Sequence, residues 1–199
     1  MPKLLQQTEL RIEWSDVLNR IDKDKFGSEA RSSGVHMSGI IRHCMGYDQR
    51  IDDPDEMPLC MALGLAWEQW AVGLFPSLIW QPGEESLDDI YGTPDGMNEI
   101  QIKGRCEIIV EEWKATYKSR QRHGQDILSA TAWMWQISGL AKMLQVHYAR
   151  LHVLWINGDY KPPSPVYVTY LIEFTQAELD RTWNNIFVTN RSNAKPEVH

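Results

Sequence analysis

A tight hairpin is encoded near the middle of the chain, in GTPDGMNEIQIKGRCEIIVEEWKAT at residues 92–116. Two short strand-like runs, NEIQI and RCEIIVEEW, are separated by Lys103-Gly104, a two-residue connection typical of a β-hairpin. Such a turn fixes the strand register, and this register sets Asp95 directly across from Glu112. A β-bulge would shift the pairing by one residue and turn Asp95 to the wrong face.

Three ionisable side chains converge in this register. Successive side chains point to opposite faces of a strand, so Glu112 and Lys114 share one face, while Glu111 and Trp113 point the other way. Two facing carboxylates, Asp95 and Glu112, repel each other in a purely structural sheet, whereas a hard divalent cation would favour them. We therefore expect Mg²⁺ or Mn²⁺ here. The alternative is a solvated strand face on which Glu and Lys pair weakly.

The composition favours a single domain. A chain of 199 residues, 43% of them hydrophobic, can bury one core, and we expect one domain over residues 1–189 with a flexible polar tail over 190–199. The formal charge of −7 argues against nonspecific nucleic-acid binding by the whole surface, so such binding needs a local patch. No apolar run reaches the length of a membrane span and the N-terminus lacks a secretory signal, so we expect a cytoplasmic protein without membrane contact.

Helix-like and strand-like segments are interleaved along the chain. We expect helices over residues 12–21, 38–50, 57–75, 127–144 and 175–186, and strands within 77–116, 149–158 and 165–174. Ser38 is the expected N-cap of its helix, and Thr175 with Glu178 forms a T-x-x-E capping box. This order predicts an α/β (α+β) domain with a central mixed β-sheet flanked by helices.

The spacing of GTPDG and VEEWKAT resembles that of the PD-(D/E)XK nuclease superfamily, and is most similar to its RecB-like and lambda-exonuclease-like branch. Three more segments fit this branch. Glu68, in GLAWEQW, is similar to the helical acidic residue of the family, and Gln136, in WMWQISGL, to the glutamine after the catalytic strand. HMSGIIRHCMGYDQR is similar to the N-terminal helix that touches DNA. The resemblance covers about residues 32–174.

The resemblance implies a restriction-endonuclease-like core and a deoxyribonuclease that hydrolyses phosphodiester bonds to leave a 5′-phosphate. It implies that Asp95, Glu112 and the backbone carbonyl of Trp113 hold Mg²⁺ or Mn²⁺. Glu68 would support a first or second ion, and Lys114 would assist the attacking water. Branch members with an iron–sulfur cluster carry four cysteines, so none is expected with the three found here.

Two of these residues can also be interpreted from their sequence context, without the family resemblance. A carboxylate on an apolar helix, such as Glu68, is costly unless an arginine or a metal ion pairs with it. Gln136 lies on an equally apolar helix, where a core amide bonded to backbone is the alternative to a substrate contact. The family often has Tyr four residues after the glutamine, whereas this chain has Leu140, which weakens a phosphate-binding role there.

Basic and polar residues at two places predict contacts with DNA. The segment KATYKSRQRH follows the catalytic strand without an acid, and a loop near residue 36 leads into a helix whose N-terminus favours anions. Together with Gln136, the candidates are Lys118, Arg120, Arg122, Ser33, His36, Ser38 and Arg42. The alternative for most of these residues is that they lie at a solvent-exposed helix start or in a loop and have no role in binding DNA.

The expected activity is that of an exonuclease in phage-type DNA recombination or repair, in the bacterial host cytoplasm if a phage encodes the chain. Alternatives are a structure-selective endonuclease resembling a junction resolvase, and a nonhydrolytic DNA-binding protein on the same scaffold. DNA is the expected partner. A single-strand annealing or recombination protein and a homo-oligomer are further partners that the resemblance allows.

Overall fold

The computed structural model describes residues 1–10, 32–46, 64, 66–68, 70–71, 78–80, 82–157 and 165–194. The helix expected over residues 12–21 lies outside this part of the chain. Of the helix expected over 57–75, residues 64, 66–68, 70 and 71 are described, and all are helical. We call these residues the Glu68 helix.

The strands are β1 (Lys3–Leu10), β2 (Val35–His36), β3 (Leu78–Trp80), β4 (Glu85–Leu87), β5 (Ile90–Gly92), β6 (Gly96–Ile102), β7 (Arg105–Thr116), β8 (Tyr148–Trp155) and β9 (Val166–Glu173). The helices are α2 (Met37–Cys44), α4 (Arg120–His123), η3 (Ile127–Ser129), α5 (Thr131–Met143), α6 (Gln176–Thr182), η4 (Trp183–Val188) and η5 (Arg191–Asn193). Of these, η3 and η5 are 3₁₀-helical and η4 is π-helical.

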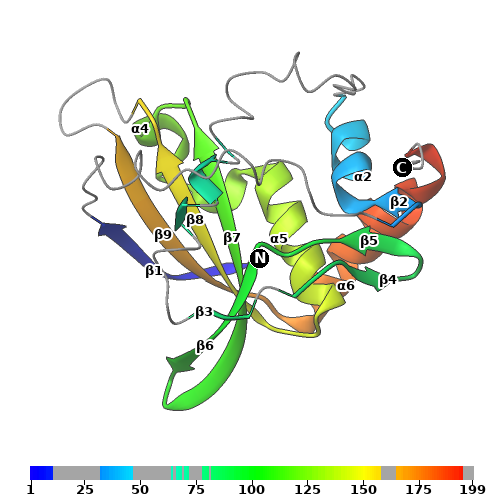
Figure 1. The fold of residues 1–199 in the computed structure, drawn as a ribbon, viewed down its shortest axis with the longest axis horizontal. Coiled ribbons are helices and arrows are strands. Elements are labelled where there is room, and N and C mark those ends of the chain that lie inside the picture. The colour runs from blue at the N-terminus through cyan, green and yellow to red at the C-terminus, as the bar shows by residue number, and fades with distance from the viewer. Residues whose placement is uncertain are drawn as a thin grey trace.

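A six-stranded mixed sheet in the order β1-β9-β8-β7-β6-β3 forms the centre of the fold (Figure 1). Among the described strands of this sheet, β7 and β8 pair in parallel and the other pairs are antiparallel. A second sheet of three short strands has the order β2-β5-β4. The predicted α/β class with a central mixed sheet flanked by helices is therefore confirmed.

The central hairpin has the register expected from its turn. Strand β6 pairs with β7 from Ile102↔Arg105 to Gly96↔Glu111 without a bulge. Both turn residues have positive φ, +51° at Lys103 and +79° at Gly104, which matches the right-handed twist of the flanking strands. The ladder ends at Gly96, so Asp95 is the first residue beyond it.

The two faces of the large sheet carry different cores. One face, with Val110 and Leu151, packs against α5 through residues such as Ile137, and α2 and α6 lie beyond α5 (Figure 1). The opposite face forms a smaller aromatic cluster of Trp113, Leu154 and Tyr167 with Trp67, Trp70 and Ala71 of the Glu68 helix. Strand β7 therefore lies between α5 and the Glu68 helix, and its two faces belong to different environments.

Helix α2 begins earlier than expected. Its N-cap is His36, with extended backbone angles and no side-chain cap, so the expectation that Ser38 caps this helix is wrong. The reason is tertiary: Val35 and His36 pair with Ile90 and Tyr91 as a short parallel strand, and the helix starts directly after this pairing.

The C-terminal segment docks onto the β4–β5 hairpin. The capping box of Thr175 with Glu178 is present as predicted, and the chain stays helical through α6 and η4 to Val188. The indole of Trp183 donates to Asp88 at 2.7 Å. Part of the expected tail is described: η5 is 3₁₀-helical and Ala194 is buried. The division of the chain at residue 190 stays a prediction.

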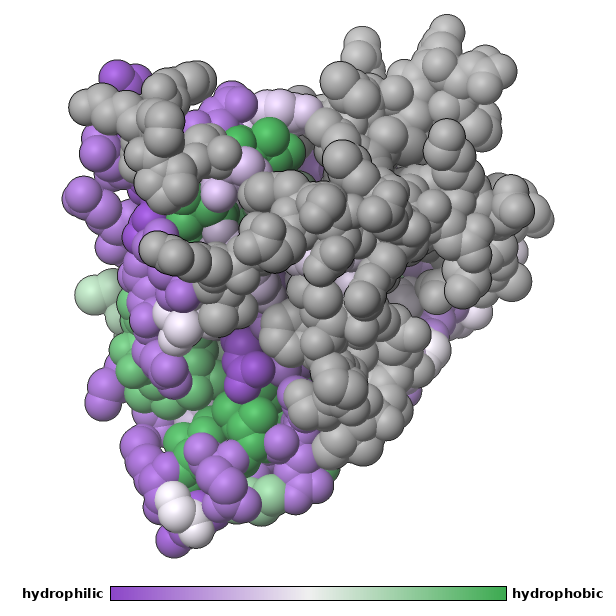
Figure 2. Space-filling view, turned by 60° about the vertical axis from the view of Figure 1, so that its left-hand side comes forward, coloured by the Kyte–Doolittle hydropathy of each residue, from purple (hydrophilic) through white to green (hydrophobic). Residues whose placement is uncertain are grey.

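Described residues on the face turned forward in Figure 2 are mostly hydrophilic, and hydrophobic side chains gather in the lower part of that view, at the height of the β6–β7 hairpin in Figure 1. Ile108 on β7 is 42% exposed. Among the described helices, none combines the length and the apolar character required to cross a membrane.

Candidate active site

A cluster of charged side chains forms beside β7 where β6 begins. Asp95 leaves the sheet at this point, and its Oδ2 accepts a hydrogen bond of 2.7 Å from the backbone N–H of Trp113. The bond ties Asp95 to β7, one residue along from its formal pairing partner Glu112. The hairpin therefore brings Asp95 and Glu112 together, as its turn predicts.

Glu112 is fully buried and holds two hydrogen-bond donors on one oxygen. Its Oε1 accepts from the ammonium of Lys114 and, at 2.6 Å, from the amide of Gln136 on α5. No N–H or hydroxyl of the described residues donates to Oε2, which is buried. A buried carboxylate oxygen without a donor is costly, so this oxygen is available to a cation.

Glu68 joins the cluster from the Glu68 helix. Burial, followed by the charges of Asp95 and Glu112, raises the pKa of Glu68 to about 8, and a hydrogen bond with Asp95 adds to the rise. The sequence offered an arginine or a metal ion as the partner of this carboxylate. Its described electrostatic neighbours are two further acids and Lys114, so one cation serves three carboxyl groups.

The same burial and proximity of charges shift the pKa values of the other members of the cluster. Burial and then the charge of Asp95 raise the pKa of Glu112 to about 8, against the opposing charge of Lys114. Burial also raises the pKa of Asp95, opposed by Lys114 and the Trp113 N–H. For Lys114, burial acts to lower the pKa, but Glu112 and Asp95 outweigh it and the net shift is upward.

The donor set fits a hard divalent cation in chemical type, with three carboxyl groups and the buried Oε2 of Glu112. It is not a closed ligand shell: in the described part of the chain, no three His, Cys, Asp or Glu side chains are arranged as ready metal ligands. A bound ion would be held by Asp95, Glu112, Glu68 and the carbonyl of Trp113. It would supply the positive charge that this cluster lacks.

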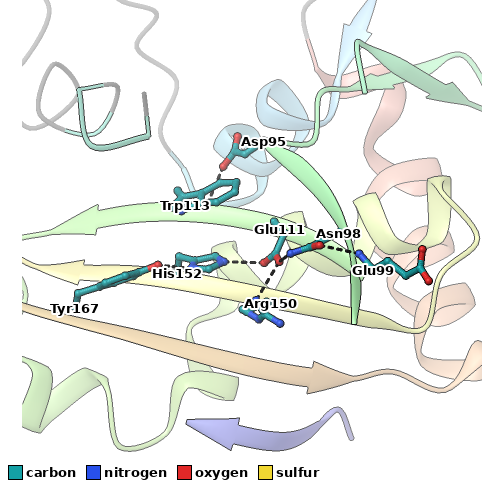
Figure 3. A network of polar contacts seen from close by, with 8 residues as sticks. All are labelled: Asp95, Asn98, Glu99, Glu111, Trp113, Arg150, His152 and Tyr167. Carbon is teal, nitrogen blue, oxygen red and sulfur yellow. Dashed lines mark hydrogen bonds and ion pairs between the residues drawn. The ribbon is translucent and has the colours of Figure 1, made fainter. Parts of the chain in front are cut away.

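A second polar network lies on the other face of β7 and was not expected from the sequence (Figure 3). Its centre is Glu111, which contacts His152 Nε2 at 2.7 Å, Arg150 at 3.2 Å and the amide of Asn98 at 3.2 Å. His152 Nδ1 bonds the hydroxyl of Tyr167. Except for Arg150, these residues are at least 98% buried.

Protonation in this network follows from burial. Burial lowers the pKa of His152, although Glu111 opposes the shift, so the imidazole is neutral. Burial raises the pKa of Tyr167, which keeps its hydroxyl hydrogen. Tyr167 therefore donates to Nδ1, and Nε2–H donates to Glu111. One signal in the sequence pointed here, because His152 is a lone imidazole in the apolar run LHVLW and a buried polar group needs a partner.

The basic residues that follow β7 lie in and around the short helix α4. Ser119 caps the short helix α4, Lys118 and Arg122 are exposed, and Arg120 forms a 2.9 Å ion pair with Glu9 of β1. Arg120 is therefore engaged within the protein. Lys118 and Arg122 are the exposed cations of this segment.

The residues predicted to contact phosphate near α2 are Ser33, His36, Ser38 and Arg42, and their surroundings differ from those of the acid cluster. His36 is buried, with Nε2 2.8 Å from the Ser32 carbonyl and Nδ1 3.4 Å from Glu84. The Glu84 carboxylate beside the ring disfavours a phosphate there. Ser33 is exposed, whereas Ser38 and Arg42 are half-buried on α2. A DNA contact by these four residues stays a prediction.

Comparisons with known proteins agree with this architecture. No protein-family model matches the chain, and the search of curated proteins found no match. Solved structures do match. A crystal structure of LHK-Exo in complex with dAMP has a TM-score of 0.52 at 14% identity, covering 80% of this chain and 88% of that one. An alkaline exonuclease (LHK-Exo) from Laribacter hongkongensis has a TM-score of 0.50 at 11% identity, covering 91% and 94%.

The chain therefore shares the fold of these exonuclease structures. At these identities the likeness establishes the fold alone. The chemistry of the site has to be argued from the side chains of this chain.

Proposed function

We propose that this protein is a metal-dependent deoxyribonuclease that hydrolyses DNA phosphodiester bonds. The observation that carries the proposal is the convergence of Asp95, Glu112 and Glu68 on one buried spot with Lys114 as the one described cation in contact with Glu112. Three carboxyl groups with raised pKa values and a buried oxygen that lacks a donor are unfavourable without a further positive charge.

Each side chain has a distinct part in this reading. Asp95 and Glu112 would hold the ion with support from Glu68, and a bound Mg²⁺ or Mn²⁺ would supply positive charge beside the scissile phosphate and lower the pKa of a bound water. Gln136 fixes Glu112 through Oε1, which orients Oε2 toward the ion. Lys114 assists the attacking water. Water adds to phosphorus as the bond to the 3′-oxygen breaks, which leaves a 5′-phosphate and a 3′-hydroxyl.

The proposal includes DNA as the substrate. A structural neighbour was crystallised in complex with dAMP, a deoxynucleoside monophosphate, and this supports a nucleic-acid substrate for the present chain. Lys118 and Arg122 follow the catalytic strand and are exposed, so they can hold the phosphates of a strand that runs past Lys114.

The preferred version is an exonuclease of a phage-type recombination or repair pathway in the cytoplasm of a bacterial host. The exonuclease structures that share the fold support this version over a junction resolvase. A homo-oligomer and a single-strand annealing partner belong to the same version and need their own tests.

The test incubates the purified chain with three DNA substrates: end-labelled linear duplex, end-labelled single strand and covalently closed circular duplex. Each reaction contains Mg²⁺, Mn²⁺ or a chelator, and Glu112→Gln is purified in parallel to control for contaminating nucleases. We expect mononucleotides from linear DNA only in the presence of metal, intact circles, and no product from Glu112→Gln.

Two other results have defined meanings. Cleavage of circular or branched DNA would replace the exonuclease by the structure-selective endonuclease. DNA binding without cleavage under any metal condition would contradict hydrolysis and favour the nonhydrolytic DNA-binding protein.

A further inference from the structure

We propose that His152, clamped by Glu111 and Tyr167, is a positioning residue that holds Asp95 and Glu68 at the spacing needed to bind a divalent ion. This inference rests on the proposed function and assigns a role to the network on the opposite face of β7. None of its members is among the proposed ligands of the ion, so the role assigned to them is to position those ligands.

His152 is fixed at both ring nitrogens. Nδ1 is bonded by the Tyr167 hydroxyl of β9, and Nε2 lies 2.7 Å from Glu111 of β7. Glu111 is itself fixed by Arg150 of β8 and Asn98 of β6. The network therefore joins four neighbouring strands by side chains, at the level where the β6–β7 ladder ends (Figure 3).

The clamped imidazole supports Trp113 from beneath. The two rings are stacked, with centroids 4.7 Å apart and planes inclined by 12°. The backbone N–H of Trp113 holds Asp95 Oδ2 at 2.7 Å. The stacked ring and this amide belong to the same residue, so packing that fixes Trp113 also helps to fix the donor that holds Asp95.

The other side of the network reaches Glu68. The Tyr167 ring meets Trp67 edge to face at a centroid distance of 5.0 Å, and Trp67 packs on Trp70 at 4.7 Å. Trp67 precedes Glu68 directly in the Glu68 helix. The rings of His152 and Tyr167 are thus packed between two tryptophans. Trp113 holds Asp95 through its backbone N–H, and Trp67 lies next to Glu68 in the Glu68 helix.

Asp95 and Glu68 come from different elements and repel each other when both are ionised. The proposed role of the network is to keep these two carboxyl groups close together. Partners behind the ligands of a metal commonly change metal affinity by about 10–100-fold when they are removed. The alternative is a buried polar network that only stabilises the fold. That alternative predicts a lower melting temperature with unchanged metal affinity in the protein that remains folded.

The experiment measures Mn²⁺ affinity by isothermal titration calorimetry and the melting temperature of the full chain without DNA. Tyr167→Phe removes one hydroxyl from the network, and the matched control Tyr170→Phe removes one from the other face of β9, where the Tyr170 hydroxyl lies 3.5 Å from the Gly124 carbonyl. His152→Ala removes the platform under Trp113, whereas His152→Phe restores a ring there without hydrogen bonds.

We expect His152→Ala to weaken Mn²⁺ binding by about tenfold or more, Tyr167→Phe by less, and Tyr170→Phe not at all. His152→Phe should bind Mn²⁺ more tightly than His152→Ala. If His152→Ala does not fold, Tyr167→Phe decides. Tyr167→Phe with the Mn²⁺ affinity of the wild type would overturn the positioning role while leaving the nuclease proposal intact. Absence of Mn²⁺ binding by the wild type would instead overturn the proposed function, and the inference with it.

Discussion

Glu112 and Lys114 differ from an ordinary surface ion pair because the carboxylate is fully buried and a second and third acid stand beside it. Exposed pairs of Glu and Lys contribute about 0–1 kcal/mol to stability. Here the Lys114 side chain is 20% exposed and the Glu112 side chain 0%. Such an arrangement is unfavourable for stability alone, which is the physical reason to read it as a site.

Lys114→Met tests the catalytic use of this cation. We expect kcat to fall by at least about a hundredfold, because Lys114 is proposed to assist the attacking water at the scissile phosphate. The matched control is Lys142→Met, which breaks a 2.7 Å ion pair with Asp180 between α5 and α6. Equal kcat values for the two variants under saturating DNA and Mg²⁺ would remove Lys114 from the mechanism.

The raised pKa values predict how pH affects the metal-free protein. Glu68 and Glu112 have pKa values of about 8 in the folded state, compared with 4.5 as the ordinary value. The folded state therefore binds more protons than the unfolded state between these limits, and stability is lost as pH rises from about 4.5 through about 8.

This loss is measured by thermal unfolding in chelator across the pH range, where 1 kcal/mol corresponds to about 2–4 °C in a chain of this size. In Glu112→Gln the loss should be smaller, since one of the two acids is gone. Added Mn²⁺ should stabilise the wild type most at the alkaline end, where both carboxyl groups are ionised. A wild type that becomes more stable between pH 6 and 9 in chelator would contradict the shifts.

At the level of elements, the local sequence was enough to predict the structure at the central hairpin turn and at the capping box. Lys103-Gly104 sets the register that brings Asp95 to Glu112, and the capping box of Thr175 starts α6. Long-range pairing decided the rest: Val35 and His36 form a strand with β5, which overrides Ser38 as a cap. The network around Glu111, His152 and Tyr167 could not be assembled from the sequence for the same reason, since its members come from four strands whose order the sequence does not specify.

The turn of the central hairpin is directly testable. Gly104 has φ of +79°, a conformation that costs an L-residue about 1–2 kcal/mol, so Gly104→Ala should lower the free energy of unfolding by about that amount. Gly83→Ala is the control, because Gly83 is exposed, open to a Cβ and outside the left-handed region. Chemical denaturation compares the two. A Gly104→Ala variant as stable as Gly83→Ala would contradict the turn geometry.

On the scale of the whole molecule, the formal charge of −7 has to be reconciled with the proposal that the protein binds DNA, a polyanion. In the proposed function, the cationic segment after β7 and metal ions bound at the acid cluster would provide the positive potential that the average surface lacks. The fold is shared with exonuclease structures, and the proposed chemistry depends on the side chains of this chain.

The double variant Lys118→Ala/Arg122→Ala tests this local patch. We expect weaker binding of linear DNA and a salt dependence whose logarithmic slope falls by about one for each phosphate that the variant no longer neutralises. Fluorescence anisotropy with Ca²⁺ in place of Mg²⁺ measures both quantities on uncleaved DNA. Arg181→Ala, an exposed change on α6, should leave them unchanged. An identical salt slope in the double variant and the wild type would exclude the patch from DNA binding.

The most direct test of the acid cluster as a metal site is a Mn²⁺ titration of the wild type and of Glu112→Gln by calorimetry at pH 7, in two buffers of different ionisation enthalpy. The account predicts saturable binding by the wild type with release of protons, because Glu68 and Glu112 are largely protonated below their pKa values of about 8. It also predicts binding at least about tenfold weaker in Glu112→Gln. Equal Mn²⁺ affinity in the two proteins, or no binding by the wild type, would contradict it.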